Sequence, residues 1–110
     1  MKIAIIGSRN LEVNDLENYV FGASEIVSGG ARGIDTCAEK YASEKGIKLK
    51  VFLPDYKRYG KGAPLKRNLE IIEYADRVIA FWDGKSRGTK FVIDQCEKIN
   101  KPVEVVLVNN

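Results

Sequence analysis

The stretch Lys2-Ile3-Ala4-Ile5-Ile6-Gly7-Ser8-Arg9, written KIAIIGSR, places four apolar residues in a row directly before a glycine. A strand that is buried on one face alternates apolar and polar residues, whereas a strand covered on both faces is apolar almost throughout. The sequence therefore predicts a strand over Lys2–Ile6 that lies inside a sheet with helices on both faces. A turn that begins with Gly7 follows this strand.

Four other apolar, β-branched runs predict further strands, and stretches with apolar residues three and four positions apart lie between them. The further predicted strands are Glu25–Ser28, Lys50–Leu53, Arg77–Phe81 and Val103–Val108. The predicted helices are Ile34–Lys45, Pro64–Tyr74 with Leu69, Ile71, Ile72 and Ala75 on its buried side, Thr89–Asn100 and, as a weaker candidate, Asn14–Phe21. This alternation predicts a single three-layer α/β domain over residues 1–110, with a five-stranded parallel sheet ordered 3-2-1-4-5 and helices on both faces. The one long connection, Asp55–Ala63, is expected to be a functional loop.

The composition excludes several kinds of chemistry. The 110 residues include 18 basic and 15 acidic side chains, for a net charge of +3, and no histidine. Without histidine, Ser-His and Cys-His catalysis, histidine-ligated metals and a histidine base are excluded. Cys37 and Cys96 are too few for a zinc site, so we predict no metal and expect reduced thiols packed as small apolar side chains.

No membrane segment is expected. The longest uncharged apolar run, Ile3–Gly7, is far shorter than the ~20 residues that span a bilayer. The first residues also lack the apolar segment and cleavage site of a signal peptide. We therefore expect a cytoplasmic protein without membrane contact.

Glycines and arginines gather in the segments that follow the predicted strands. Five of the six arginines, all except Arg77, lie there or at the helix start that follows. Ligands of open parallel sheets bind at the carboxyl ends of the strands, and arginine suits bidentate phosphate contacts. Glycine turns that lead into helices add backbone N–H groups and a favourable dipole. The predicted phosphate-binding residues are Gly7, Ser8, Arg9, Gly29, Gly30, Arg32, Gly33, Arg67, Asn68, Gly84, Ser86, Arg87, Gly88 and Thr89.

Two glycine-rich turns carry this prediction. Ser28–Gly33 is similar to a dinucleotide-binding turn, in which Gly29 and Gly30 admit a phosphate and Gly33 allows close packing at the helix start. Gly84–Thr89 is a second such turn, and two at one edge are a stronger signal than either alone. A Walker A loop is absent.

Two residues near these turns have open roles. Asp35 is expected to stabilise a helix N-terminus, with contact to Arg32 or to a ribose as alternatives. Trp82 either stacks on a base or packs at the rim of the core.

Four motifs in order resemble the SLOG superfamily, which unites the Smf/DprA proteins and the Lonely Guy phosphoribohydrolases. They are Ser28–Asp35 (SGGARGID), Arg67-Asn68, the strand Ala75–Ala80, and Gly84-x-Ser86-x-Gly88-Thr89. The short chain is most similar to the small stand-alone YspA/YpsA-related members. The resemblance implies a Rossmann-like fold with a nucleotide-derived ligand at the carboxyl edge. It also implies that the two glycine turns, with Arg32, Ser86 and Thr89, form a phosphate cradle and that Arg67 faces a sugar-phosphate.

One departure from the family pattern bears on catalysis. Lonely Guy enzymes place a catalytic glutamate two residues after the Gly-Thr pair, where this chain has Phe91. The preferred function is therefore binding or sensing of ADP-ribose, NAD or a nucleoside phosphate, with no required cofactor. The alternative is a nucleotide N-glycosidase with Asp83, Asp35 or Glu70 as the acid.

A third hypothesis is a DprA-like protein that binds single-stranded nucleic acid. In this hypothesis basic side chains contact the strand and aromatic side chains stack on its bases. These residues are Arg58, Lys61, Lys66 and Arg67, with Tyr56, Tyr59 and Trp82. A net charge of +3 favours this hypothesis less than the other two.

A homodimer is also expected, because small domains often cover an exposed apolar helix face with a second copy. The candidate faces are Phe91, Val92 and Ile93 on the last helix and Leu69 with Ile72 on the one before.

Overall fold

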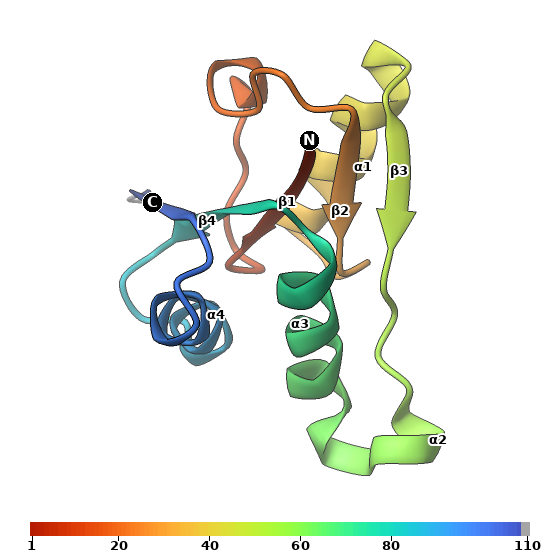
Figure 1. The fold of residues 1–110 in the computed structure, drawn as a ribbon, viewed down its shortest axis with the longest axis vertical. Coiled ribbons are helices and arrows are strands. Elements are labelled where there is room, and N and C mark those ends of the chain that lie inside the picture. Colours follow the sequence, from red (N-terminus) through yellow and green to blue (C-terminus); the bar gives the residue numbers. More distant parts are fainter. Residues whose placement is uncertain (109–110) are drawn as a thin grey trace.

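Five parallel strands form the central sheet of the structure, a computed structural model that describes residues 1–108 (Figure 1). The last two residues of the predicted domain 1–110 lie outside the described residues. Hydrogen bonding orders the strands β3-β2-β1-β4-β5, which confirms the predicted topology. The strands are β1 Lys2–Gly7, β2 Glu25–Ser28, β3 Lys48–Val51, β4 Arg77–Trp82 and β5 Val103–Leu107.

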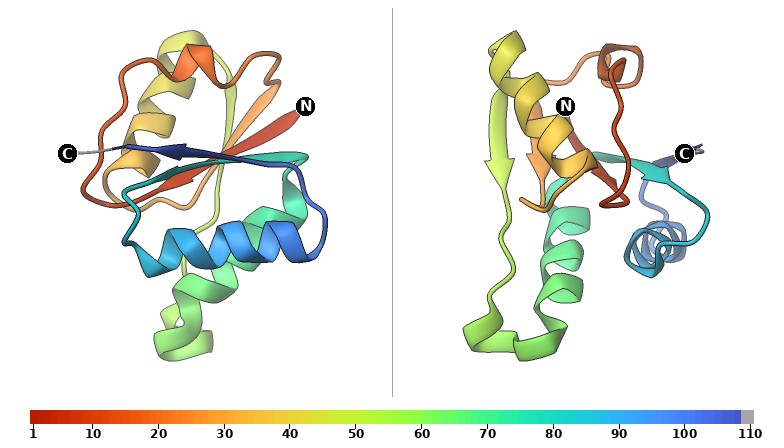
Figure 2. Two further views of the ribbon diagram at one scale, coloured as in Figure 1. Left: turned by 90° about the vertical axis from the view of Figure 1, so that its left-hand side faces the viewer. Right: turned by 180° about the vertical axis from the view of Figure 1, so that it is seen from behind.

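Helices cover both faces of the sheet (Figure 2). Helix α1 lies against one face, whereas α3 and α4 lie against the other. The helices are α1 Ile34–Lys45, the short α2 Tyr56–Tyr59, α3 Ala63–Tyr74 and α4 Arg87–Lys98, with 3-10 turns at Leu16–Asn18 and Gly60–Gly62. The three layers confirm the predicted Rossmann-like α/β fold.

Burial on two sides explains why β1 is apolar throughout. Ile3 and Ile5 pack with Ile34 of α1, whereas Ala4 and Ile6 pack in the cluster that includes side chains of α3 and α4. Successive side chains of a strand point to opposite faces, so each face receives alternate residues. Apolar continuity in this strand therefore reflects a core on each side of the sheet.

Local sequence determines where the helices begin and end. Helix α1 is followed by Gly46 in a left-handed conformation, with a φ of 66°. Ser86 caps α4 by accepting a hydrogen bond from the Thr89 N–H at 3.3 Å. Pro64 lies in the first turn of α3, where its missing N–H needs no partner.

The predicted helix over Asn14–Phe21 is wrong, because only Leu16–Asn18 forms a 3-10 turn. The buried side chains of Leu11, Leu16 and Val20 all belong to the core cluster on the α1 face. Three separate anchors in ten residues hold this segment as an irregular strap, so packing overrides a weak helical pattern.

Two predicted segments near β3 differ from the structure. The strand covers Lys48–Val51 rather than Lys50–Leu53, because β2 pairs with it from Glu25↔Lys48 to Ser28↔Val51 and then ends. The predicted loop Asp55–Ala63 contains α2 and a 3-10 turn. The Asp55 carboxylate starts α2 by accepting a hydrogen bond from the Arg58 N–H.

The buried side of α3 includes Ile71, Ile72 and the adjacent Ala75, as predicted, but not Leu69, which is 39% exposed. The helical repeat turns Leu69 away from the face that holds Arg67 and Ile71.

Three of the five residues predicted to form a dimer face are unavailable for that role. Ile72, Val92 and Ile93 are buried against the sheet within the chain itself. Both helices need these residues to cover the strands, which leaves Leu69 and the half-buried Phe91 nearer the surface.

No helix within residues 1–108 has the length and apolar character needed to cross a membrane. Both cysteines are free thiols, with Cys96 buried and Cys37 half-buried. Burial raises the pKa of the Cys96 thiol to about 11.

Candidate functional site

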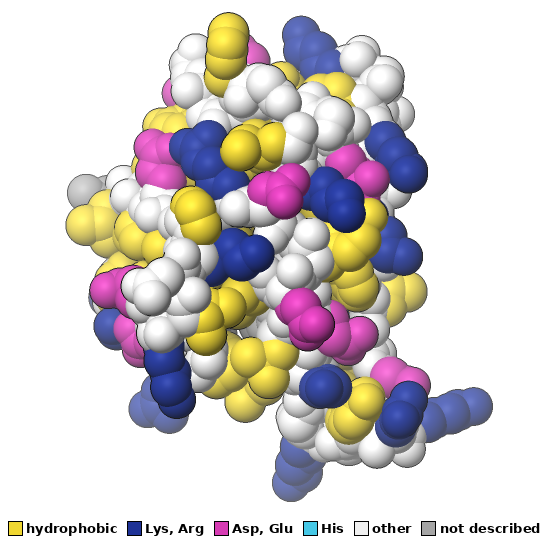
Figure 3. All heavy atoms as spheres, in the orientation of Figure 1, with side chains coloured by type: hydrophobic (Ala, Val, Ile, Leu, Met, Phe, Trp, Pro, Cys, Tyr) yellow, Lys and Arg dark blue, Asp and Glu magenta, His cyan; other side chains and the backbone are white. Residues whose placement is uncertain are grey.

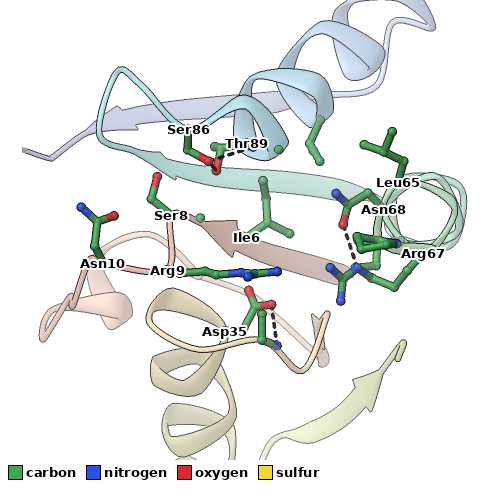
Figure 4. A pocket seen from close by; sticks show the side chains of 16 residues that line it. Ile6, Ser8, Arg9, Asn10, Asp35, Leu65, Arg67, Asn68, Ser86 and Thr89 are labelled. Atoms are coloured by element: carbon green, nitrogen blue, oxygen red, sulfur yellow. Dashed lines mark hydrogen bonds between the residues drawn. The ribbon is translucent and has the colours of Figure 1, made fainter. Parts of the chain in front are cut away.

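A cleft of about 420 Å³ lies at the carboxyl edge of the sheet (Figure 4). The turns after β1 and β2, the first half of α3 and the start of α4 contribute the side chains that line it. The cleft is lined by Ile6, Gly7, Ser8, Arg9, Asn10, Ala31, Asp35, Pro64, Leu65, Arg67, Asn68, Ile71, Ser86, Gly88, Thr89 and Val92.

Three hydroxyl groups form one wall of this cleft. The Ser86 and Thr89 oxygens lie 3.1 Å apart at the start of α4, and Ser8 points toward them from the turn after β1 (Figure 4). The Ser8 hydroxyl accepts a hydrogen bond from the Asp83 N–H at 3.4 Å. Gly88 belongs to the same wall, and a Cβ atom added to it would meet nothing within 4 Å. This wall is therefore polar and open to a ligand.

Asp83 organises the turn behind the hydroxyl wall. Its Oδ1 accepts hydrogen bonds from the N–H groups of Lys85 and Ser86, both at 2.8 Å. These donors hold the pKa of the Asp83 carboxyl below its usual range. The Trp82 indole N–H donates to the Ser86 carbonyl at 3.0 Å, and its ring packs on the core. This geometry favours the packing role of Trp82 over base stacking.

Asp35 and Arg67 lie on the opposite side of the cleft. The Asp35 side chain accepts a hydrogen bond from the Ala31 N–H at 3.0 Å, and the residue is only 5% exposed. Loss of hydration on burial raises the pKa of its carboxyl group. Arg67, 7% exposed, donates from Nη1 to the Gly29 carbonyl and from Nε to Asn68 Oδ1 at 2.8 Å. Arg67 thus joins α3 to the β2–α1 turn.

A second hollow of about 400 Å³ adjoins the cleft and shares Arg9, Ala31 and Arg67 with it. The remaining residues that line it are Gly29, Gly30, Arg32, Thr36, Pro54 and Tyr56. This hollow lies between the β2–α1 turn and the segment that leads into α2.

The predicted phosphate-binding residues separate into three groups. Gly7, Ser8, Arg9, Arg67, Asn68, Ser86, Gly88 and Thr89 line the cleft. Gly29, Gly30 and Arg32 line the second hollow, which also includes Arg9 and Arg67. Gly33, Gly84 and Arg87 line neither, and Gly33 instead packs against the backbone of the β1 turn.

The sequence prediction missed the apolar part of the cleft. Ile6, Pro64, Leu65, Ile71 and Val92 line it beside the polar groups. Leu65 carried a usable signal, because it is an apolar residue in the first turn of a predicted helix within a basic segment. The other four resemble ordinary core residues in sequence.

Of the three candidate acids, Asp35 lines the cleft. The Asp83 carboxylate is held by the turn before α4, and Glu70 lies exposed on α3. Phe91, at the position of the Lonely Guy glutamate, packs on the core. Within residues 1–108 no group of three or more Cys, Asp or Glu side chains is arranged to hold a metal ion.

Replacing Asp35 by asparagine tests the burial of this carboxyl group. Because its pKa is raised on folding, the folded chain binds the proton more tightly, and this group makes stability fall as the pH rises above its ordinary pKa of 3.8. We expect Asp35→Asn to be more stable than the wild type at pH 7, with the gain disappearing below pH 3.8. Urea titrations across this range measure the effect. A wild type that is the more stable at pH 7 would contradict it.

Comparison with known proteins shows which family the chain is similar to. The model of the YspA, cpYpsA-related SLOG family matches residues 1–59, which include the turns after β1 and β2. The Gene 61 protein of Mycobacterium phage D29 is 33% identical over 84 residues, which cover 71% of this chain and 67% of the phage protein. No solved structure matches the chain.

Proposed function

The chain belongs to the YspA, cpYpsA-related SLOG family, and from this premise we propose that it binds a nucleotide-derived ligand in the cleft. ADP-ribose, NAD and nucleoside phosphates are the ligands to test first. Family membership supports nucleotide-related binding in general, and the chemistry of the cleft supports this narrower proposal.

The observation that carries the proposal is the convergence of four chain segments on one cleft. The turns after β1 and β2, the first half of α3 and the start of α4 all contribute side chains. These are the segments that follow the carboxyl ends of the strands, where open parallel sheets bind ligands. A volume of about 420 Å³ also falls within the size range of small-molecule sites.

The two sides of the cleft suit different parts of a nucleotide. Ser86 and Thr89 offer hydroxyl groups at the N-terminus of α4, where the helix dipole favours a phosphate. Arg9 extends across the cleft toward Arg67 and supplies positive charge (Figure 4). Leu65 and the half-buried Pro64 provide an apolar surface for a base or sugar. The site therefore combines an anion-binding wall with an apolar one.

Gly88→Leu tests whether the ligand occupies this cleft. A Cβ atom at position 88 would meet no atom of its neighbours within 4 Å and Gly88 lines the cleft, so we expect the variant to fold with its leucine in the ligand space. A ligand at 100 times its dissociation constant adds about 2.7 kcal/mol of stability. Thermal unfolding with AMP, ADP, ADP-ribose and NAD should show a shift of several degrees for the wild type and none for Gly88→Leu.

Lys98→Leu is the matched control, because it introduces the same side chain at the far end of α4, where Lys98 is exposed. This variant should respond to nucleotides as the wild type does. A wild type that responds to none of the four, or a Gly88→Leu chain that responds equally well, would refute the proposal.

A second candidate function is cleavage of the N-glycosidic bond of the bound nucleotide. The observation that favours it is a buried carboxyl group, Asp35, with a raised pKa at the wall of the cleft. An acid of this kind can donate a proton to a leaving base. Release of free base by the wild type, and its loss in Asp35→Asn, would support hydrolysis over sensing.

A further inference from the structure

All the charged side chains that line the second hollow are positive. Three arginines, Arg9, Arg32 and Arg67, line it, and no acidic residue does. Arg9 and Arg32 are exposed, and Arg67 is buried in the wall between the hollow and the cleft. Cations that gather without an acid in the same cavity repel one another, so the arrangement favours an anion between them.

The ion pairs within residues 1–108 also leave the arginines of the hollow without a partner carboxylate in an ion pair. In the part of the chain that the structure describes, Arg77 pairs with Glu104 at 2.7 Å, whereas the ion pairs include none of the three arginines of the hollow. Asp35, which lines the adjoining cleft, interacts electrostatically with Arg67 and Arg9, and its side chain already accepts the Ala31 N–H. The positive charge of the hollow is therefore only partly compensated.

The position of Arg67 depends on a glycine at the bottom of the hollow. A Cβ atom added to Gly29 would lie 2.8 Å from Arg67 Nη1 and 3.0 Å from Asp35 Oδ2. The absent side chain lets the guanidinium group lie directly on the turn, where Nη1 donates to the Gly29 carbonyl. Two of its hydrogen bonds hold Arg67 in place, so its charge is presented to both cavities from a fixed position.

Tyr56 also lines the hollow. It is 58% exposed at the start of α2, a helix that the Asp55 carboxylate caps. A tyrosine in this position offers an O–H donor and a ring beside the arginines. The hollow therefore combines charged donors with a polar aromatic group.

We propose that the second hollow is an anion subsite, so that the ligand carries a second phosphate beyond the one at the start of α4. This inference rests on the proposed function and narrows its ligand class to nucleoside diphosphates and their diphosphate-linked derivatives. The shared wall of Arg9, Ala31 and Arg67 lets one ligand extend from the cleft into the hollow. The second phosphate contacts Arg9 and Arg32 on the exposed side and Arg67 at the boundary.

The test compares AMP and ADP by titration calorimetry at one fixed salt concentration. Wild type should bind ADP at least ten times more tightly than AMP, as one charge-assisted contact accounts for roughly a tenfold to hundredfold difference in affinity. Arg32→Ala should remove this preference and leave the affinity for AMP unchanged. The Arg32 side chain is exposed, so its loss should leave the fold intact.

Arg58→Ala is the matched control. It removes the same charge from α2, where Arg58 lies over the ring of Tyr59 and lines neither cavity. Basic side chains surround this end of the molecule (Figure 3), so the control separates a defined subsite from general attraction of anions. Arg58→Ala should keep the full preference for ADP.

The other outcomes each overturn a different statement. Equal affinity for AMP and ADP would overturn the subsite and leave the proposed function standing, whereas a wild type that binds none of AMP, ADP, ADP-ribose and NAD would overturn both. An equal loss in Arg32→Ala and Arg58→Ala would replace the subsite by a diffuse basic surface. Tighter binding of a 5′-phosphorylated single-stranded oligonucleotide than of ADP, weakened by Arg58→Ala, would replace the diphosphate by a nucleic acid.

Discussion

Gly33→Ala will destabilise the protein by more than about 3 kcal/mol, a large part of the stability of a small domain. Gly33 has a φ of 71°, which an L side chain rarely adopts, and this strain alone costs about 1–3 kcal/mol. A Cβ atom would also lie 2.4 Å from the Arg9 carbonyl oxygen and 2.8 Å from that of Ser8. Both atoms belong to the backbone and move only if the β1 turn moves. Equilibrium unfolding in urea measures the loss.

Gly22→Ala separates strain from close packing in this experiment. Gly22 also has a positive φ, of 81°, but a Cβ atom there would meet nothing within 4 Å. Its replacement should cost only the conformational strain, about 1–2 kcal/mol. If the two variants lose equal stability, the close approach of the β1 turn to the start of α1 does not matter energetically.

Arg67→Ala will weaken nucleotide binding by roughly tenfold to hundredfold and will also lower stability by about 1–3 kcal/mol. The affinity falls because Arg67 lines both the cleft and the second hollow. The stability falls because the buried Gly29 carbonyl loses its charged donor, Nη1. Calorimetry and urea unfolding measure the two losses separately.

Lys101→Ala is the control for the structural part of this effect. The Lys101 ammonium group also donates to a backbone carbonyl, that of Ala75, which precedes β4 at the opposite edge of the sheet. Its loss should lower stability without changing nucleotide affinity. Equal affinities of the Arg67 and Lys101 variants for the same nucleotide would show that Arg67 is structural only.

Sequence patterns of short range were enough to predict the sheet and its main helices. Apolar continuity in Ile3–Ile6 reflects burial on two faces, and glycine, proline and serine mark helix ends within one turn of the chain. Alternation of strands and helices then leaves few topologies, because parallel crossovers are right-handed. The same reasoning identified the carboxyl edge as the place where glycine turns and arginines meet.

The sequence alone could not assign a role to each residue at that edge. Arg67 and Gly88 looked like ligand contacts in sequence, and Gly33 was expected both to bind phosphate and to allow close packing at the helix start. In the structure Arg67 holds the β2–α1 turn, Gly33 packs against the β1 turn, and Gly88 leaves open space in the cleft. These roles depend on atoms that are distant in sequence, such as the 38 positions that separate Arg67 from Gly29.

The sequence by itself determined the strands and the helices that cover them, because these follow from periodicity and from local backbone preference. Alternation with right-handed crossovers then favoured one strand order and one edge at which polar groups collect. Only the tertiary structure decided that residues 14–21 form an irregular strap, that Leu69 faces outward, and that Arg9 and Arg67 line two adjoining cavities. Those outcomes depend on which surfaces meet when the layers pack. Packing depends on contacts between segments that are distant in sequence, so a local sequence pattern does not predict it.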